Sequence, residues 1–306
     1  MFERAYIEIS NICNLQCSFC PEVERDQKMM TVEKFKDYAK QVKPLTKQVC
    51  LHLMGEPLGH PQFQEILKVC EELELKIFLT TNGTLLKRHT EALLASNCLE
   101  QINFSVHSYF ANPQKQTLDQ YLSPILYFCD QSEKLNKDYY INLRLWNLDH
   151  PQAQKNNNLQ IFDIIEKHYS LNLNVNIDVK MNKSKKIQHK LYLHFDTEFI
   201  WPHPKQEIRS KQGSCYGLRK QVAIHANGDV VPCCLDKEAV LKLGSLHQNT
   251  LQEILKSDYA TTIKTGFENG VLTQDLCQKC QYADRFKQPK GKVNATTDSR
   301  KNSSVH

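Results

Sequence analysis

Seven of the twelve cysteines in this 306-residue chain fall into two sets whose spacing suits metal binding. The chain begins MFERAYIEIS, without the apolar segment of a secretory signal. We therefore expect a cytoplasmic protein, in which thiols stay reduced and clustered cysteines bind metal instead of forming disulfides. The first set is Cys13, Cys17 and Cys20, and the second is Cys215, Cys233, Cys277 and Cys280.

The first set places three thiols at intervals of four and three residues, with no fourth cysteine before Cys50. Three thiolates at this spacing can hold three corners of a [4Fe–4S] cube, and such clusters usually take four cysteine ligands. The fourth iron would then be open to a ligand from outside the protein. Zinc is the alternative, because the last two thiols also fit a zinc site completed by His52 or His107.

The second set surrounds a segment typical of a tight β-hairpin. QVAIHANGDVVPCC (221–234) alternates around an Asn-Gly dipeptide, which favours a two-residue turn. The hairpin would return Cys233 toward the start of its strand, and the Cys277-x-x-Cys280 pair must fold onto it. Four thiolates can hold a complete cluster or a structural zinc. Cys234 is an alternative to its neighbour as a ligand.

Strand-like and helix-like segments alternate over the first two thirds of the chain, which predicts right-handed βαβ units and a parallel sheet. VNIDV (175–179) could add a further strand to the six principal ones. We expect an α/β fold, a partial (β/α)6 TIM-like barrel followed by a small α+β domain. The expected strands cover 5–9, 47–54, 76–82, 100–107, 139–147 and 190–195, and the expected helices cover 31–42, 61–75, 84–97, 118–134 and 158–170.

Functional groups of such barrels collect in the loops that follow the strands. The three-cysteine segment follows the first expected strand, and MGEP (54–57) ends the second. TTNGT (80–84) and SVHS (105–108) end the third and fourth. The sequence therefore predicts that these four segments meet at one face of the barrel.

The last third differs in pattern from the first two. WPHPKQEI (201–208) has the composition of a linker, and 250–267 is predicted to form one helix. We expect a core domain over 1–200, an auxiliary domain over 201–287 and a disordered basic tail over 288–306.

The formal charge of +5 is confined to the end of the chain. From Arg285 onward there are six basic residues and one acidic residue, and removing them from the 39 basic and 34 acidic residues leaves 33 of each. The neutral body does not favour nucleic acid as a partner. A solvated tail is the simpler interpretation, and an RNA- or partner-binding arm is the alternative. No apolar run approaches the ~20 residues of a membrane span.

C-x3-C-x2-C after the first strand, with Gly55-Glu56-Pro57 at the end of the second, resembles the radical S-adenosylmethionine (SAM) superfamily. The resemblance covers residues 5–195 and includes the partial six-strand barrel. It implies that the open iron of a [4Fe–4S] cluster binds the amino and carboxylate groups of SAM. An electron from the cluster would cleave SAM to methionine and a 5′-deoxyadenosyl radical, which abstracts hydrogen from a substrate.

The same resemblance implies roles for individual residues. Glu56, with the adjacent backbone, would present oxygens to the ammonium group of SAM through charge-assisted hydrogen bonds. Phe19 would lie beside the adenine, and Ser105 would contact the ribose. The family more often has Gly-Gly-Glu-Pro, and Met54 stands here in place of the first glycine.

Cys215, twelve residues, Gly228, four residues and Cys233 resemble the opening of the SPASM or "twitch" auxiliary-cluster domain, and Cys277 and Cys280 supply a later pair. No cysteine follows Cys280, which implies a single auxiliary [4Fe–4S] cluster. Complete ligation would suit an electron relay that oxidises a substrate radical. An open iron would instead bind a substrate thiol or amine.

We therefore expect an oxygen-sensitive radical SAM enzyme that acts on a peptide or protein side chain, with a small metabolite as the alternative substrate. An electron donor such as flavodoxin or ferredoxin would be its partner. No general base or other catalytic residue can be named from the sequence. A non-catalytic metal-binding or electron-transfer protein is the competing hypothesis, although such a carrier would not need the ammonium acceptor of Gly-Glu-Pro.

Overall fold

The computed structural model describes residues 1–150, 156–173 and 183–286. Within these ranges, ten strands form one continuous sheet in the order β10-β9-β8-β1-β2-β3-β4-β5-β7-β6. The expected segment at 175–179 and the expected tail at 288–306 lie outside the described residues.

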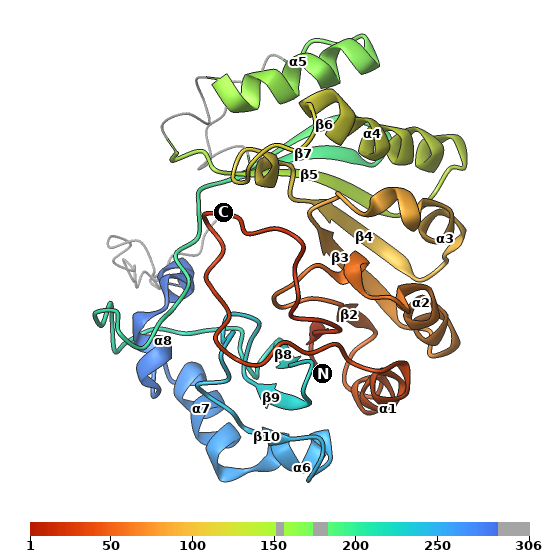
Figure 1. The fold of residues 1–306 in the computed structure, drawn as a ribbon. Coiled ribbons are helices and arrows are strands. Elements are labelled where there is room, and N and C mark those ends of the chain that lie inside the picture. The colour runs from red at the N-terminus through yellow and green to blue at the C-terminus, as the bar shows by residue number, and fades with distance from the viewer. Residues whose placement is uncertain (151–155, 174–182, 287–306) are drawn as a thin grey trace, which may run out of the picture.

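Six neighbouring parallel strands confirm the partial (β/α)6 barrel, and Figure 1 shows their helices along its outer side. The parallel strands are β1 (Arg4–Ile7), β2 (Gln48–Cys50), β3 (Lys76–Thr81), β4 (Leu99–Phe104), β5 (Tyr140–Trp146) and β7 (Leu191–Asp196). The helices are α1 (Val32–Val42), α2 (Phe63–Glu72), α3 (Thr90–Ala95), α4 (Leu118–Lys134) and α5 (Asn158–Tyr169).

Alternation along the strands separates an apolar face from a polar face. Every second residue, such as Ile7, Leu79 and Leu143, is fully buried against the helices. The residues between them, including Tyr6 and Arg144, face the barrel interior and are half-buried. Side chains of successive strand residues point to opposite faces, so the hydrophobic core lies under the helices and the interior face stays polar.

Helix caps explain where two of the predicted helices begin. The Thr31 side chain accepts a hydrogen bond from the backbone N–H of Lys34 at the start of α1, and Thr117 forms a capping box with Gln120 at the start of α4. The expected helix over 84–97 is shorter than predicted, because only the 3₁₀ turn η2 (Leu86–Arg88) and α3 form there.

The expected hairpin is present, and it extends the barrel sheet. Strand β8 (Gln221–Ile224) pairs with β9 (Asp229–Val231) around Gly228, whose φ of +86° favours glycine. β8 also pairs in parallel with β1, with Arg4 opposite Gln221, a contact that the sequence did not predict. The short strand β10 (Gly244–Ser245) completes this side of the sheet.

The helical part of the C-terminal third differs from the prediction in one place. The single helix expected over 250–267 is wrong, since α6 (Leu251–Lys256) and α7 (Asp258–Glu268) are separated by Ser257. Ser257 is extended (φ −59°, ψ 151°), and its side chain caps α7 by accepting from the N–H of Ala260.

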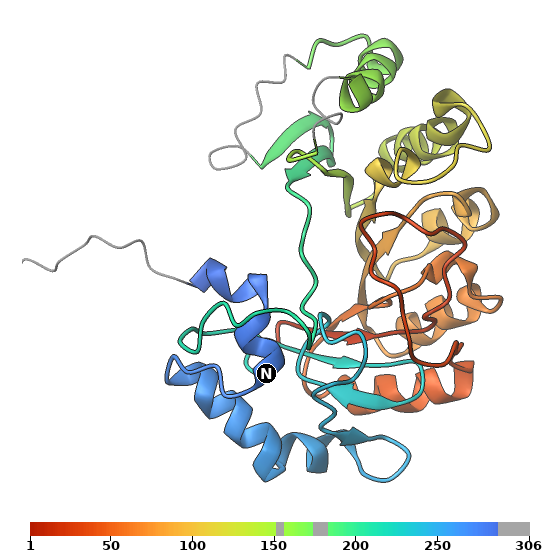
Figure 2. The same cartoon turned by 60° about the vertical axis from the view of Figure 1, so that its left-hand side comes forward.

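A short helix, α8 (Asp275–Lys279), follows, and Figures 1 and 2 show these C-terminal helices on the far side of the hairpin from α2 to α4. Strand β6 (Ser184–Gln188), which was not predicted, adds to β7 in antiparallel orientation. Within the described ranges, no helix has the length and apolar character needed to cross a bilayer.

Candidate cluster and cofactor sites

The first cysteine set lies on the long loop between β1 and α1, here called the cysteine loop (residues 10–30). Cys13 and Cys20 are exposed and Cys17 is half-buried. The N–H of Cys20 donates to the carbonyl of Cys17 (2.9 Å), which folds the segment into a turn. Partial desolvation, and then the nearby Cys17 and Cys13, raise the pKa of Cys20 to about 12. The three thiols are therefore neighbours that a bound metal cluster would deprotonate.

Two asparagines from distant elements reach these sulfur atoms. The side-chain amide of Asn112, beyond β4, donates to Cys17 Sγ (3.1 Å) and its oxygen accepts from the N–H of Gln16 (3.0 Å). The amide of Asn82 lies 3.8 Å from Cys13 Sγ. No sequence pattern marked Asn112, because its contact spans 95 residues of chain.

Gly55 allows the segment after β2 to pack against the cysteine loop. Its φ is +77°, and a Cβ atom there would lie 2.4 Å from the carbonyl oxygen of Ser10. The N–H of the next residue, Glu56, donates to the carbonyl of Ile12 (3.0 Å). A side chain at position 55 would therefore separate two segments that the sequence predicted to meet.

The Glu56 carboxylate is buried and bonded within the chain. One oxygen accepts from the N–H of Leu58 (2.9 Å) and from Thr81 Oγ1 (2.7 Å), and the other accepts from the N–H of Asn82 (2.7 Å). Burial, opposed by these hydrogen bonds, raises the pKa of Glu56 to about 7. Its side chain thus joins the ends of β2 and β3, and Pro57 begins the buried 3₁₀ turn η1 (Pro57–Gly59).

Phe19 and Ser105 lie at the same end of the barrel. The Phe19 ring lies 4.7 Å from the ring of His107, whose Nδ1 is 3.0 Å from the carbonyl oxygen of Arg144. Ser105 follows β4, and its N–H donates to the carbonyl of Thr81 (2.9 Å). Contacts of these residues with adenine and ribose stay predictions.

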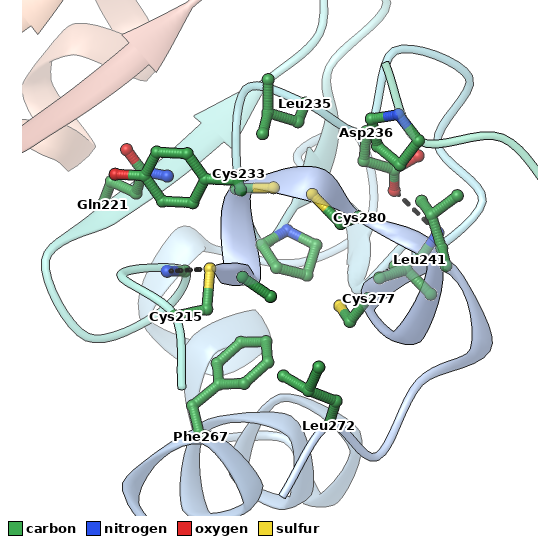
Figure 3. Close-up of a pocket in the computed structure, with 16 residues that line it drawn as sticks. Cys215, Gln221, Cys233, Leu235, Asp236, Leu241, Phe267, Leu272, Cys277 and Cys280 are labelled. Atoms are coloured by element: carbon green, nitrogen blue, oxygen red, sulfur yellow. Dashed lines mark hydrogen bonds between the residues drawn. The ribbon is translucent and has the colours of Figure 1, made fainter. Parts of the chain in front are cut away.

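The second cysteine set converges on one pocket of about 30 Å³, lined by all four expected thiols. Figure 3 shows their sulfur atoms around a common space, reached from separate segments of the chain. Cys233 is half-buried there, and desolvation, followed by the charges of the neighbouring cysteines, raises its pKa well above the usual range. The walls are mostly apolar and include Pro202, Leu235, Leu241, Phe267, Leu272, Leu276 and Ala283.

Cys234 points elsewhere. It is absent from the pocket lining and hydrogen-bonds the side chain of Tyr6, whose phenol also contacts Cys50. Cys234 therefore lies at the junction between the hairpin and the barrel interior. This placement favours Cys233 as the ligand in the pocket.

Both donor sets fit iron–sulfur clusters. Zinc draws its sulfur ligands to about 2.3 Å, so its ligands must converge tightly. Among the described residues, no group of three or more His, Cys, Asp or Glu side chains is arranged to hold a single ion. The one carboxylate lining the four-thiol pocket, Asp236, is already bonded to the N–H groups of Val240 (2.9 Å) and Leu241 (2.7 Å). Cysteine thiolates are the usual ligands of iron–sulfur clusters, and four of them line this pocket.

A second, larger cavity lies beside the cysteine loop. It has a volume of about 550 Å³ and is lined by Cys13 and by amide and hydroxyl side chains that include Asn14, Thr84, Ser108 and Asn112. Cofactor sites usually have volumes of about 300–1,000 Å³ with a few polar groups placed to orient the ligand. The protein therefore has room for a ligand next to the first cysteine set.

Comparison with known families gives two matches. The radical SAM superfamily matches residues 7–141, and SPASM, described as an iron–sulfur cluster-binding domain, matches residues 215–281. We refer to residues 215–281 as the SPASM region.

Two curated relatives illustrate the similarity. The antilisterial bacteriocin subtilosin biosynthesis protein AlbA of Bacillus subtilis is 25% identical over 283 residues, which cover 83% of this chain and 59% of AlbA. A GTP 3′,8-cyclase of Alkaliphilus oremlandii is 33% identical over 116 residues, covering 36% of this chain and 35% of the cyclase. The chain thus spans less than two thirds of the length of these relatives.

Solved structures share the fold. SuiB of Streptococcus suis bound to S-adenosylmethionine has a TM-score of 0.59 at 19% identity, over 92% of this chain and 72% of SuiB. BtrN in complex with AdoMet and 2-DOIA has a TM-score of 0.58 at 16% identity, over 92% of this chain and 93% of BtrN. The matched motifs, the barrel and the two domain models agree with one another. The chain therefore carries a radical SAM domain over residues 7–141 and a SPASM domain over residues 215–281, and its cofactors are S-adenosylmethionine and iron–sulfur clusters.

Proposed function

We propose that this protein is a radical SAM enzyme that modifies a peptide or protein side chain. Cys13, Cys17 and Cys20 would hold the cluster that binds SAM, and the four thiols of the C-terminal pocket would hold one auxiliary cluster. The observation that carries the proposal is the packing of Gly55 and Glu56 against the cysteine loop, which brings the predicted ligands and the predicted SAM motif together.

The bound cluster and SAM together supply a one-electron cleavage that yields a hydrogen-abstracting radical. The protein would orient the reactants. Glu56 holds the backbone after β3 through Thr81 and Asn82, so the strand ends around the cofactor keep a fixed spacing. Phe19, backed by His107, would provide an apolar surface for the adenine. The polar inner face of the barrel would receive the substrate.

The auxiliary cluster would act as an electron acceptor. Four thiols line its pocket, so every iron would have a protein ligand and none would be left for substrate. The apolar walls would exclude water and protect the cluster. In this role the cluster would take the electron that a substrate radical loses on oxidation. A binding role in which one iron holds a substrate group is the alternative.

A peptide substrate is supported by the names of several similar proteins. AlbA is a bacteriocin biosynthesis protein, SuiB has been crystallised with the precursor peptide SuiA, and anSMEcpe with the Cp18Cys peptide. BtrN, crystallised with 2-DOIA, keeps a small metabolite as the second candidate, since it matches this chain over 93% of its own length.

An external electron donor such as flavodoxin or ferredoxin would reduce the first cluster. Cys13 and Cys20 are exposed, so a donor could approach that cluster closely. The same exposure calls for a reducing compartment, and we therefore propose a cytoplasmic location.

The cofactor part of the proposal is tested by anaerobic reconstitution followed by iron and sulfide analysis and EPR of the dithionite-reduced protein. We expect roughly eight irons per chain. We also expect an EPR spectrum that changes when SAM is added, and formation of 5′-deoxyadenosine. Zinc at both sites, with no iron and no response to SAM, would overturn the proposal and support a non-catalytic metal-binding protein.

The substrate class is tested with a deuterated cell extract separated by size into a peptide fraction and a small-molecule fraction. Each fraction is incubated with the reconstituted enzyme, SAM and dithionite, and 5′-deoxyadenosine is examined for deuterium by mass spectrometry. Deuterium transfer from the peptide fraction alone is expected. Transfer from the small-molecule fraction alone would instead establish the metabolite hypothesis.

A further inference from the structure

A fully buried carboxylate joins three parts of the molecule at the end of β1. Glu8 is 0% exposed and forms a bidentate ion pair with Arg25 of the cysteine loop, Nη1 to Oε2 at 2.9 Å and Nη2 to Oε1 at 2.6 Å. It also accepts from the N–H of Met54 (3.2 Å), next to Gly55, and from the N–H of Ala226 (3.0 Å), in the hairpin. One side chain therefore connects the cysteine loop, the predicted SAM motif and the SPASM region.

A second set of contacts holds the same part of the cysteine loop from the SPASM region. The backbone N–H groups of Glu24 and Arg25 donate to the two carboxylate oxygens of Glu238 (3.0 and 3.1 Å). The Arg25 Nε donates to the carbonyl of Lys237, whose ammonium group donates in turn to the carbonyl of Glu22 and to Glu238. Residues 22–25, which begin two positions after Cys20, are thus held by a pair of residues more than 200 positions away in the chain.

The chemistry of these contacts suits positioning better than net stabilisation. A buried ion pair gains little over apolar packing, because removing both charges from water offsets most of the attraction. A bidentate arginine–carboxylate pair does fix the relative orientation of its partners. Here two partners of Glu8, Arg25 and Met54, belong to segments that border the first cysteine set, and the third, Ala226, belongs to the hairpin.

We propose that Glu8, Arg25 and Glu238 are positioning residues, through which the SPASM region holds the cysteine loop in the conformation that binds SAM. This inference rests on the proposed function of the first cysteine set. It predicts that SAM binding at the N-terminal cluster depends on a carboxylate of the C-terminal region that has no part in metal ligation.

The test uses the full chain, reconstituted anaerobically, and the variants Glu238→Ala and Glu238→Gln. SAM is titrated into the reduced protein and the change in the EPR spectrum is followed. For Glu238→Ala we expect the half-saturating SAM concentration to rise about tenfold, which corresponds to about 1.4 kcal/mol. Glu238→Gln should give a smaller rise, because its amide oxygen still accepts a hydrogen bond from one backbone N–H group.

Lys220→Ala is the matched control. Lys220 pairs with Glu3 (2.6 Å) and so also links the N-terminal segment to the SPASM region, but its side chain is 42% exposed and lies at the opposite end of β1 from the cysteine loop. This variant should bind SAM as the wild type does. If any weakening of the contacts between the N-terminal segment and the SPASM region lowered SAM affinity, both variants would bind SAM more weakly. That result would overturn the positioning role.

The inference also fails if Glu238→Ala keeps the wild-type iron content and its half-saturating SAM concentration stays within about twofold of the wild-type value. Such a ratio corresponds to a change in binding free energy of less than about 0.5 kcal/mol. If Glu238→Ala loses iron, the same criterion applies to Glu238→Gln. A wild-type protein that does not respond to SAM would refute the proposed function instead.

Hydrogen exchange at the backbone amides of Glu24 and Arg25 tests the contact with Glu238 itself. Exchange is expected to be faster in Glu238→Ala than in Lys220→Ala. Equal exchange rates would overturn it.

Discussion

The two cysteine regions use the same ligand atom in different surroundings. Cys13 and Cys20 are exposed on one loop, and a ligand can reach them from solvent. The second set comes from separate segments and is enclosed by apolar side chains (Figure 3). Solvent access to the thiols, more than their number, therefore distinguishes a site that binds a cofactor from solvent from a site that retains its cluster.

The difference extends to how each site is assembled. Cys13, Cys17 and Cys20 are close together in one loop, and distant residues such as Asn112 and Glu238 contact that loop. The other four thiols meet only after the hairpin, α7 and α8 have packed. Free energy of metal binding is therefore coupled to folding more strongly at the second site than at the first.

Removing each cysteine set should separate the two roles most clearly. A Cys13→Ala/Cys17→Ala/Cys20→Ala variant is expected to form no 5′-deoxyadenosine, because it lacks the ligands of the cluster that would bind and reduce SAM. A Cys277→Ala/Cys280→Ala variant should lose about half the iron, roughly four atoms per chain, and still cleave SAM. Iron analysis and chromatography of 5′-deoxyadenosine measure both effects. Loss of SAM cleavage in both variants, with folding intact, would contradict the division of roles.

Enclosure should also decide how quickly each cluster is lost. On exposure to a chelator or to air, we expect iron to leave the first site about tenfold faster than the second, because release from the enclosed pocket requires local unfolding. Mössbauer or EPR spectra recorded over time follow the two populations. Equal rates of loss would show that the apolar walls give no protection.

A buried carboxylate near the first site makes stability depend on pH. The pKa of Glu56 is about 7 in the folded protein against an ordinary value of 4.5, so folding favours its protonated form. Its contribution to stability is complete below pH 4.5 and is lost as pH rises through 7, by up to about 3 kcal/mol. Glu56→Gln should remove this dependence.

Denaturant unfolding of the metal-free wild type and the Glu56→Gln variant at pH 5 and pH 8 measures the effect. The variant should gain stability relative to the wild type as pH rises. An unchanged difference between the two proteins at the two pH values would mean that Glu56 is ionised throughout and that its three hydrogen bonds outweigh its burial.

Substituting the two adjacent cysteines that follow β9 should give the smallest effect, a difference in the iron content of the auxiliary site alone. Cys233→Ser is expected to lose the auxiliary iron, whereas Cys234→Ser should keep it, because Cys234 contacts Tyr6 outside the pocket. Iron content per chain is sufficient to compare them. Iron loss in Cys234→Ser alone would reverse the assignment.

Local patterns predicted much of this molecule. The six barrel strands, the capped helices α1 and α4 and the hairpin follow from periodicity, caps and a turn dipeptide, all of which act within a few residues. The break at Ser257 was missed, although serine followed by aspartate is typical of a helix N-terminus.

Long-range contacts were not predictable in the same way. Asn112 reaches Cys17 across 95 residues, and Glu238 reaches Arg25 across 213. Such side chains carry no periodic signal, and their partners become visible only when the fold brings them together. The pairing of β8 with β1 belongs to the same class.

That pairing affects the order in which the sheet can form on the ribosome. β1 gains its neighbour β2 once Cys50 has been made, but its other neighbour exists only after Gln221–Ile224 has been made. At about 5–20 residues per second, the intervening stretch takes about 10 to 30 s to synthesise. During that interval one side of β1 exposes unpaired backbone groups, which other strands can bind. A nascent chain that stalls before Gln221 should therefore be a target for chaperones that bind exposed strand edges.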